Sequence, residues 1–358
     1  MEISISDQEK TMNRQSQKGG DGSTNIQAGE LTIVQGMTYP EVREVALDIF
    51  ESNFYKLAGE AKEIAAERAE QITGDFLDKL QKENPEGFKK AQDPDFQHAL
   101  FTVQKEYART GDEDLADLLV DLLVDRSKQE KRDILRIVLN ESLSVAPKLT
   151  DDQLAALAII FFAKYTQNQG IGNHEMLANN FDQFVKPFVS KLSKKQACYQ
   201  HLEFSGCGSI SMSTNSLSSI YGKIYQGLFL KGFDKDEIEK RGISIGLDPR
   251  FFIPCLNDEN KLQVKANRLE GLSEYMDKQD IPKDDKGKII ALFNLNKMND
   301  NEIKDKIIEI SPYMADTFEI WSDSPLQNFN LTSVGIAIGH ANIKRLVGEF
   351  SNLSIWIN

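Results

Sequence analysis

The chain has 358 residues, of which 40% are hydrophobic, so it is long enough to bury a large core and to form two domains. The formal net charge of -13 argues against binding to nucleic acid or to anionic membranes, because the densest basic cluster is only Lys191, Lys194 and Lys195. Three scattered cysteines without a C-x-x-C pair argue against a disulfide framework and against structural zinc.

We expect a cytoplasmic protein without constitutive membrane insertion. The polar N-terminus has no apolar core of a signal peptide. The longest apolar run, residues 154–163, is about half the length that a membrane-spanning helix needs.

Residues 1–22 are polar and predict a disordered tail, whereas residues 23–37 favour a short β-arch or hairpin. Two similar pieces, IQAG and IVQG, lie on either side of a turn, and glutamines can form ladders between identical stacked strands. A lone two-stranded hairpin is only marginally stable in water, so it needs a partner to pack against. That partner is either its own helical body or the same segment of another chain. The expected interaction residues are Asn25, Ile26, Gln27, Gly29, Leu31, Ile33 and Gln35.

A long helix is predicted next. Thr38 and Glu41 form a capping-box pattern, and apolar residues then recur every three or four positions as far as Asn84. An unbroken helix would have about 45 residues and span roughly 65 Å, with bends expected at Gly59 and Gly74. A helix of this length must pack on several others or form a coiled coil with a copy of itself.

The remaining chain predicts more helices in two domains, residues 38–204 and 205–358, separated by a charge-free Ser/Gly-rich segment at 204–216. In the first domain we expect helices at 96–109, 113–126, 130–145, 151–165 and 173–192. In the second we expect helices at 217–230, 234–241, 261–278, 283–295, 301–310, 312–321 and 332–348, and a closing strand at 353–357. The predicted fold class is therefore mainly α, a multi-helical protein of two domains.

Two helices carry regular patterns. Asp114, Asp117, Asp121 and Asp125 share one side of a helix, which favours a solvated acidic face over a site for a hard cation. In the helix at 332–348, glycines at positions 335, 339 and 348 permit close helix approach. In a membrane this spacing would be a dimer motif, but the apolar stretch is too short and contains His340, so packing in a core is favoured.

No residue pattern identifies a catalytic group, a metal site or a cofactor. The four histidines lack the spacing of a helical zinc pair. A candidate ligand loop contains His201, Cys207, Gly208 and Ser209, where a Cys–His pair or an anion-binding turn is conceivable. It lacks the lysine of a phosphate-binding loop, so a plain interdomain loop is the favoured interpretation.

Two stretches carry a resemblance. The segment GDGSTNIQAG at residues 20–29 resembles N-terminal segments of bacterial conflict (antiphage) proteins, and its IQAG core is similar to RIP homotypic interaction motifs, which assemble by stacking in register. The pieces YARTGD at 107–112 and LADLLVD at 115–121 resemble an uncharacterised family of bacterial helical proteins. That resemblance implies a bacterial protein and no particular activity.

These observations favour an oligomerising interaction protein, a sensor or adaptor that binds copies of itself and a protein partner. Two alternatives stay open. One is a nucleotide- or small-molecule-binding enzyme with a site at residues 201–213. The other is a helical effector that acts on membranes through residues 154–163 or 334–343.

Overall fold

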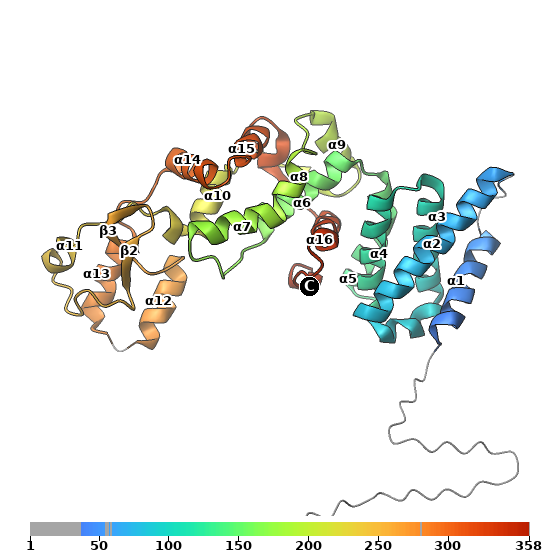
Figure 1. Cartoon of the computed structure of the whole chain (residues 1–358), viewed down its shortest axis with the longest axis horizontal. Coiled ribbons are helices and arrows are strands. Elements are labelled where there is room, and N and C mark those ends of the chain that lie inside the picture. Colours follow the sequence, from blue (N-terminus) through green and yellow to red (C-terminus); the bar gives the residue numbers. More distant parts are fainter. Residues whose placement is uncertain (1–36, 54–56, 58, 280, 358) are drawn as a thin grey trace, which may run out of the picture.

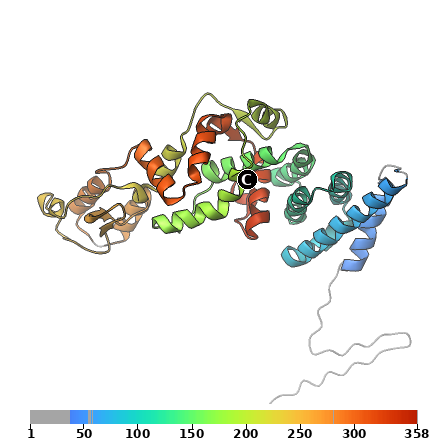
Figure 2. The ribbon, with the colours of Figure 1, turned by 45° about the horizontal axis from the view of Figure 1, so that its top comes forward.

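The computed structural model describes residues 37–357 apart from 54–56, 58 and 280, and its fold is mainly α, which confirms the predicted class (Figure 1). The predicted β-prone segment and its interaction residues lie outside the described residues. Both views show an elongated molecule with a helical lobe at one end and a smaller mixed lobe at the other (Figures 1 and 2).

The predicted long helix is wrong, because two helices form instead, α1 (Tyr39–Asn53) and α2 (Glu60–Glu83). Gly59 precedes α2 with φ 60° and ψ -143°, a backbone conformation that residues with a Cβ rarely adopt. The two helices then run antiparallel, with Phe50 of α1 in one cluster with Ala65 of α2 and an ion pair between Arg43 and Glu70. Gly74 lies inside α2 and does not interrupt it.

Residues 37–145, here the N-terminal lobe, continue with short, well-capped helices. They are η1 (Pro85–Gln92), α3 (Pro94–Thr110), α4 (Glu113–Ser127) and α5 (Ile134–Val145). Aspartates at positions 93, 112 and 133 accept the first free backbone N–H groups of α3, α4 and α5 at 2.9, 3.0 and 2.9 Å. These caps explain why helix starts were predicted within a few residues in this lobe.

The centre of the molecule is built on two crossing helices, α6 (Asp151–Tyr165) and α16 (Ser333–Val347). A Cβ on Gly335 would lie 1.9 Å from the carbonyl oxygen of Cys207, and one on Gly339 would lie 2.8 Å from that of Leu157. Gly335 and Gly339 therefore serve close packing in the core, as predicted. The prediction is wrong for Gly348, which follows the end of α16, is exposed and would meet no atom within 4 Å through a Cβ. Within the described ranges, no helix is long and apolar enough to cross a membrane.

Shorter elements surround this pair. They are η2 (Ala146–Lys148), α7 (His174–Phe184), α8 (Lys186–Val189), α9 (Gln196–Phe204), α10 (Leu217–Ile224), η3 (Gln226–Phe229), α14 (Asp300–Ile310), α15 (Met314–Ser322) and η4 (Pro325–Asn328). Strand β1 (Gly208–Ile210) pairs antiparallel with β4 (Phe329–Leu331).

The predicted closing strand is wrong. Residues Leu353–Ile355 form a 3-10 turn, η5, which Asn352 caps by accepting the backbone N–H of Ser354 at 2.9 Å. The apolar alternation that suggested a strand instead places Leu353 and Ile357 in the core.

A separate hydrophobic cluster defines the distal lobe, residues 230–297. It contains α11 (Asp236–Lys240), β2 (Phe252–Cys255), β3 (Asp258–Val264), α12 (Leu269–Lys278) and α13 (Lys283–Phe293). The helix predicted at 261–278 is wrong over its first part, because residues 258–264 pair with β2 as an antiparallel hairpin.

The hydrophobic clusters do not follow the predicted boundary at 204–205. Leu202 and Cys207, on either side of it, lie in the same large cluster as the N-terminal lobe. The distal lobe is instead an insertion between α10 and α14, and the chain returns through α14, α15 and α16 to the centre (Figure 1).

Candidate functional site

The acidic side of α4 meets two other helices. Asp114 and Asp117 are exposed, as predicted, but the prediction of a solvated face is wrong for Asp121, which is fully buried, and for Asp125, which is half-buried. They are covered because α16 packs across α4 on one side and α2 on the other (Figure 1).

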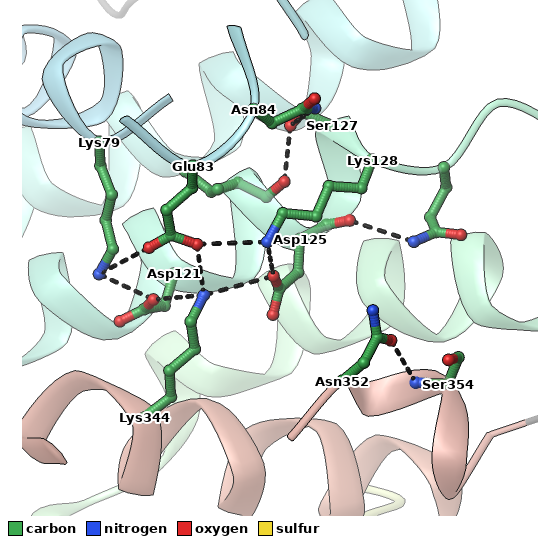
Figure 3. Close-up of polar contacts among 12 residues, drawn as sticks. Lys79, Glu83, Asn84, Asp121, Asp125, Ser127, Lys128, Lys344, Asn352 and Ser354 are labelled. Atoms are coloured by element: carbon green, nitrogen blue, oxygen red, sulfur yellow. Dashed lines mark hydrogen bonds and ion pairs between the residues drawn. The ribbon is translucent and has the colours of Figure 1, made fainter. Parts of the chain in front are cut away.

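Lys344 of α16 lies at the centre of this junction (Figure 3). Its side chain is 8% exposed, and its Nζ lies 2.8 Å from Glu83, 3.1 Å from Asp121 and 3.4 Å from Asp125. Two further lysines complete the charge balance. Lys79 lies 2.8 Å from Asp121, and Lys128 lies 2.8 Å from Asp125 and 3.2 Å from Glu83. We call these six residues the charged network.

The charged network shifts the pKa values of Lys344 and Asp125. Burial by itself would lower the pKa of Lys344, but the charges of Asp125 and Asp121 outweigh it and raise that pKa. Burial by itself would raise the pKa of the Asp125 carboxyl, but the positive charges of Lys344 and Lys128 outweigh it and lower that pKa below its usual value. The ammonium of Lys344 is therefore fully charged at neutral pH and unsuited to act as a base or nucleophile.

His340 lies one turn before Lys344 on α16 and is 2% exposed. Its ring lies among Phe161, Phe350 and Trp356, with centroids 5.9, 5.4 and 5.7 Å away. Nε2 donates to the carbonyl oxygen of Ser351 at 2.6 Å. Burial lowers the pKa of His340, so the imidazole is neutral and ties α16 to the C-terminal segment.

A cleft of about 660 Å³ opens beside the charged network, lined by Glu83, Asp125, Lys344, His340 and residues 348–353. Its size suits a small ligand. Its lysines and carboxylates already neutralise one another, so the cleft presents fixed charges of both signs without excess of either. Within the described part of the chain, no group of three His, Cys, Asp or Glu side chains is placed to hold a metal ion.

The predicted ligand loop has a different structural setting. His201 is exposed and lies 2.9 Å from Gln153 through Nδ1. Cys207 is fully buried, which raises the pKa of its thiol to about 12. Gly208 is packed so tightly that a Cβ there would lie 2.1 Å from Phe329, while Ser209 is exposed. The loop lies away from the residues of the charged cleft, and its ligand-binding role stays a prediction.

One signal in the sequence could have found the charged network. Lys344 directly follows Ile343 in a helix whose apolar residues Ile336, Ile338 and Ile343 predict burial. A lysine in that position needs carboxylate partners. The aspartates of α4 are the most regular acidic stripe in the chain, and pairing the two would have placed α16 on α4.

Comparisons with known proteins give one match. A protein-family model whose description names no activity matches residues 36–357. No curated protein and no solved structure matches the chain.

Proposed function

Because the chain belongs to this uncharacterised family, we propose its function from its own residues: it is an interaction protein that assembles with copies of itself through residues 23–36. In this proposal the helical body is a scaffold that the assembly brings together, and the assembled bodies recruit a protein partner. The protein acts as a sensor or adaptor.

The observation that carries the proposal is that residues 37–39 are held firmly on the helical body. Met37 packs against the main core, and Thr38 binds Glu41 through both its backbone N–H (2.7 Å) and its hydroxyl (2.8 Å). Tyr39 packs edge-on against Phe88 at 6.3 Å and donates to Asp78 at 3.1 Å. The body is therefore fixed from the first residue after the segment, so any pairing of segments would also set the positions of the bodies.

The sequence of the segment supports self-association. Its glutamines, β-branched residues and low charge are typical of segments that stack in register, and such a segment needs a partner to be stable. The resemblance of residues 20–29 to segments of antiphage proteins further supports a role in bacterial defence.

Solution mass tests the assembly. We expect the full chain to form a defined oligomer by light scattering after size exclusion, and a chain lacking residues 19–36 to be smaller in subunit number while keeping its helical circular dichroism. A chain lacking only residues 1–18 is the matched control and should assemble like the full chain. Equal subunit numbers for all three would refute assembly through the segment.

Phage plating tests the biological role. Bacteria that express the full chain should give fewer plaques than bacteria expressing the chain without residues 19–36 at equal protein level. Equal plating across a broad phage panel would contradict the role in defence without affecting the assembly proposal.

A further inference from the structure

The last described residues, 349–357, lie between two cavities. One is the cleft of about 660 Å³ beside the charged network. The other has a volume of about 470 Å³ and is lined by the end of α6, the loop at 166–169 and α7. Glu349, Phe350 and Ser351 line both cavities and so form the wall between them. We call residues 349–357 the C-terminal clasp.

The two halves of the clasp are held in different ways. Leu353 and Ile357 are buried in the core, and the indole N–H of Trp356 donates to a backbone carbonyl oxygen of α6 at 2.7 Å. The wall at 349–351 is held by the stacking of Phe350 on Trp356, with centroids 6.0 Å apart, and by the hydrogen bond from Nε2 of His340 to its backbone. The wall therefore depends on the state of one imidazole.

The surroundings of His340 accommodate only its neutral form. Three aromatic rings enclose the imidazole, and Nε2 already donates to the carbonyl oxygen of Ser351 at 2.6 Å. The second nitrogen, Nδ1, has almost no solvent-accessible surface and no hydrogen-bond partner in the described chain. In the neutral ring Nδ1 carries no proton. Protonation would turn it into a buried, charged donor without an acceptor, which is costly while the clasp is closed.

The charged groups near His340 do not remove this cost. The charged side chains that line the cleft beside the ring or act on it are Lys82 and Glu83 on α2, Asp121, Asp125 and Lys128 on α4, Lys344 on α16 and Glu349 in the clasp. The ends of α5 and α6 meet this site with apolar side chains. Asp121 and Asp125 favour the imidazolium, but both are paired with lysines of the charged network. Burial is the largest effect, so the pKa of His340 lies below its ordinary value of 6.5.

We propose that the C-terminal clasp is an acid-sensitive latch, in which protonation of His340 at Nδ1 releases residues 349–351 and joins the two cavities. Because Nδ1 is shielded in the closed clasp, the proton binds when the clasp opens, and the imidazolium then opposes closure. The open state binds the proton more readily, so the clasp is held at neutral pH and weakens as the pH falls below about 6.5. This latch is independent of assembly through residues 23–36.

Hydrogen exchange of the full chain, followed by mass spectrometry at pH about 7.5 and about 5, tests the proposal on either side of the ordinary histidine pKa. Each rate is divided by the intrinsic exchange rate at that pH, which gives a protection factor. We expect the protection of residues 349–357 to fall at least about tenfold at the lower pH, since one unit of difference in pKa between the open and closed states has this effect. Protection of α6 and α16 should remain.

Tryptophan emission gives a second measurement on the same chain. Trp356 is in the clasp, and Trp321 is the other of the two tryptophans. Release of the clasp should shift the emission to longer wavelength over the same pH range. Trp356→Phe should remove this shift.

Two variants assign the effect to the imidazole. His340→Gln keeps a donor for the carbonyl oxygen of Ser351 but takes up no proton, so its clasp should stay protected at both pH values. His98→Gln, at an exposed position of α3, is the matched control and should lose protection like the natural chain. Phe350→Ala keeps His340 and weakens the closed clasp, so the midpoint of the emission shift should move up towards 6.5.

Three results would overturn the proposal. They are equal protection of the clasp at both pH values in the natural chain, equal losses of protection in His340→Gln and His98→Gln, and a loss that extends to α6 and α16 to the same degree. If His340→Gln does not fold, an unchanged midpoint in Phe350→Ala would overturn the proposal by itself.

Discussion

Replacing Lys344 with methionine should destabilise the main core strongly. Methionine keeps most of the length and apolar surface of lysine but removes the charge. Glu83, Asp121 and Asp125 would then share the junction of α2, α4 and α16 with their central cation gone.

The size of the effect follows from burial. Removing one partner of a buried ion pair costs about 3–5 kcal/mol, because the remaining charge stays desolvated. Lys344 is 8% exposed and Asp121 is 0% exposed, so this case applies. Lys79 and Lys128 remain at 2.8 Å from Asp121 and Asp125, which places the expected loss at the lower end, about 3 kcal/mol.

Urea unfolding followed by tryptophan fluorescence measures this loss. Both tryptophans, Trp321 and Trp356, belong to the main core, so the signal reports that cluster and not the distal lobe. Lys240→Met is the matched control, because Lys240 is 60% exposed in its ion pair with Asp236 and its replacement should leave the stability nearly unchanged. Adding Asp121→Asn to Lys344→Met should recover part of the stability. A loss below about 1 kcal/mol for Lys344→Met would refute the structural role of the charged network.

Three further outcomes are expected. Burial by itself would raise the pKa of Asp95, but hydrogen bonds from Arg136 and Arg126 outweigh it and lower that pKa to about 2 from 3.8. The stabilisation by Asp95 is therefore complete above pH ~4 and is lost as the pH falls towards 2. Asp95 is 43% exposed, so Asp95→Asn should cost only about 1 kcal/mol at neutral pH and flatten the acid limb of a stability–pH curve; an unchanged acid limb would contradict this. Gly74→Ala should stabilise the protein by about 0.5–1 kcal/mol, since a Cβ there meets nothing within 4 Å. Gly335→Ala should destabilise it by about 1–3 kcal/mol in the same urea assay, because a Cβ there would lie 1.9 Å from the carbonyl oxygen of Cys207. Equal effects of the two substitutions would be inconsistent with the packing of α16 on Cys207. Cys207 should react with a thiol-specific disulfide reagent only on unfolding, because it is fully buried and its pKa is raised to about 12; rapid reaction in the native protein, lost in Cys207→Ser, would show that the loop opens.

Capping residues, apolar runs and glycine spacing predicted those helices whose position depends on residues close together in the sequence. The helix expected at 151–165 forms with those bounds, since Thr150 and Gln153 make the capping box and the run between them and Tyr165 is apolar all round. The helix after Thr332 likewise begins at its cap, and Gly335 and Gly339 pack in the core as expected. A fully apolar run and a spaced glycine pattern both have one common solution in a globular protein, which is a buried helix.

Features that depend on distant partners were missed. The stripe from Val42 to Leu80 looks continuous because both arms of the α1–α2 hairpin bury one face, so the periodicity gives no sign of the break. Only the bend expected at Gly59 pointed to it. Strand β3 depends on pairing with β2, and the insertion of the distal lobe depends on which apolar faces meet. The burial of Asp121 depends on Lys344, more than two hundred residues away in the chain. Such pairings are set by tertiary contacts that a single sequence does not contain.

The most direct test of the central claim is the solution mass of the full chain with Ile26 and Ile33 both replaced by proline, beside the same chain with both replaced by valine. Proline removes a backbone donor from each arm of the segment and prevents strand stacking, whereas valine keeps the β-forming character. The account predicts that the valine protein keeps the subunit number of the natural chain and that the proline protein falls to a lower one. Equal subunit numbers for both would contradict the claim that residues 23–36 join the chains.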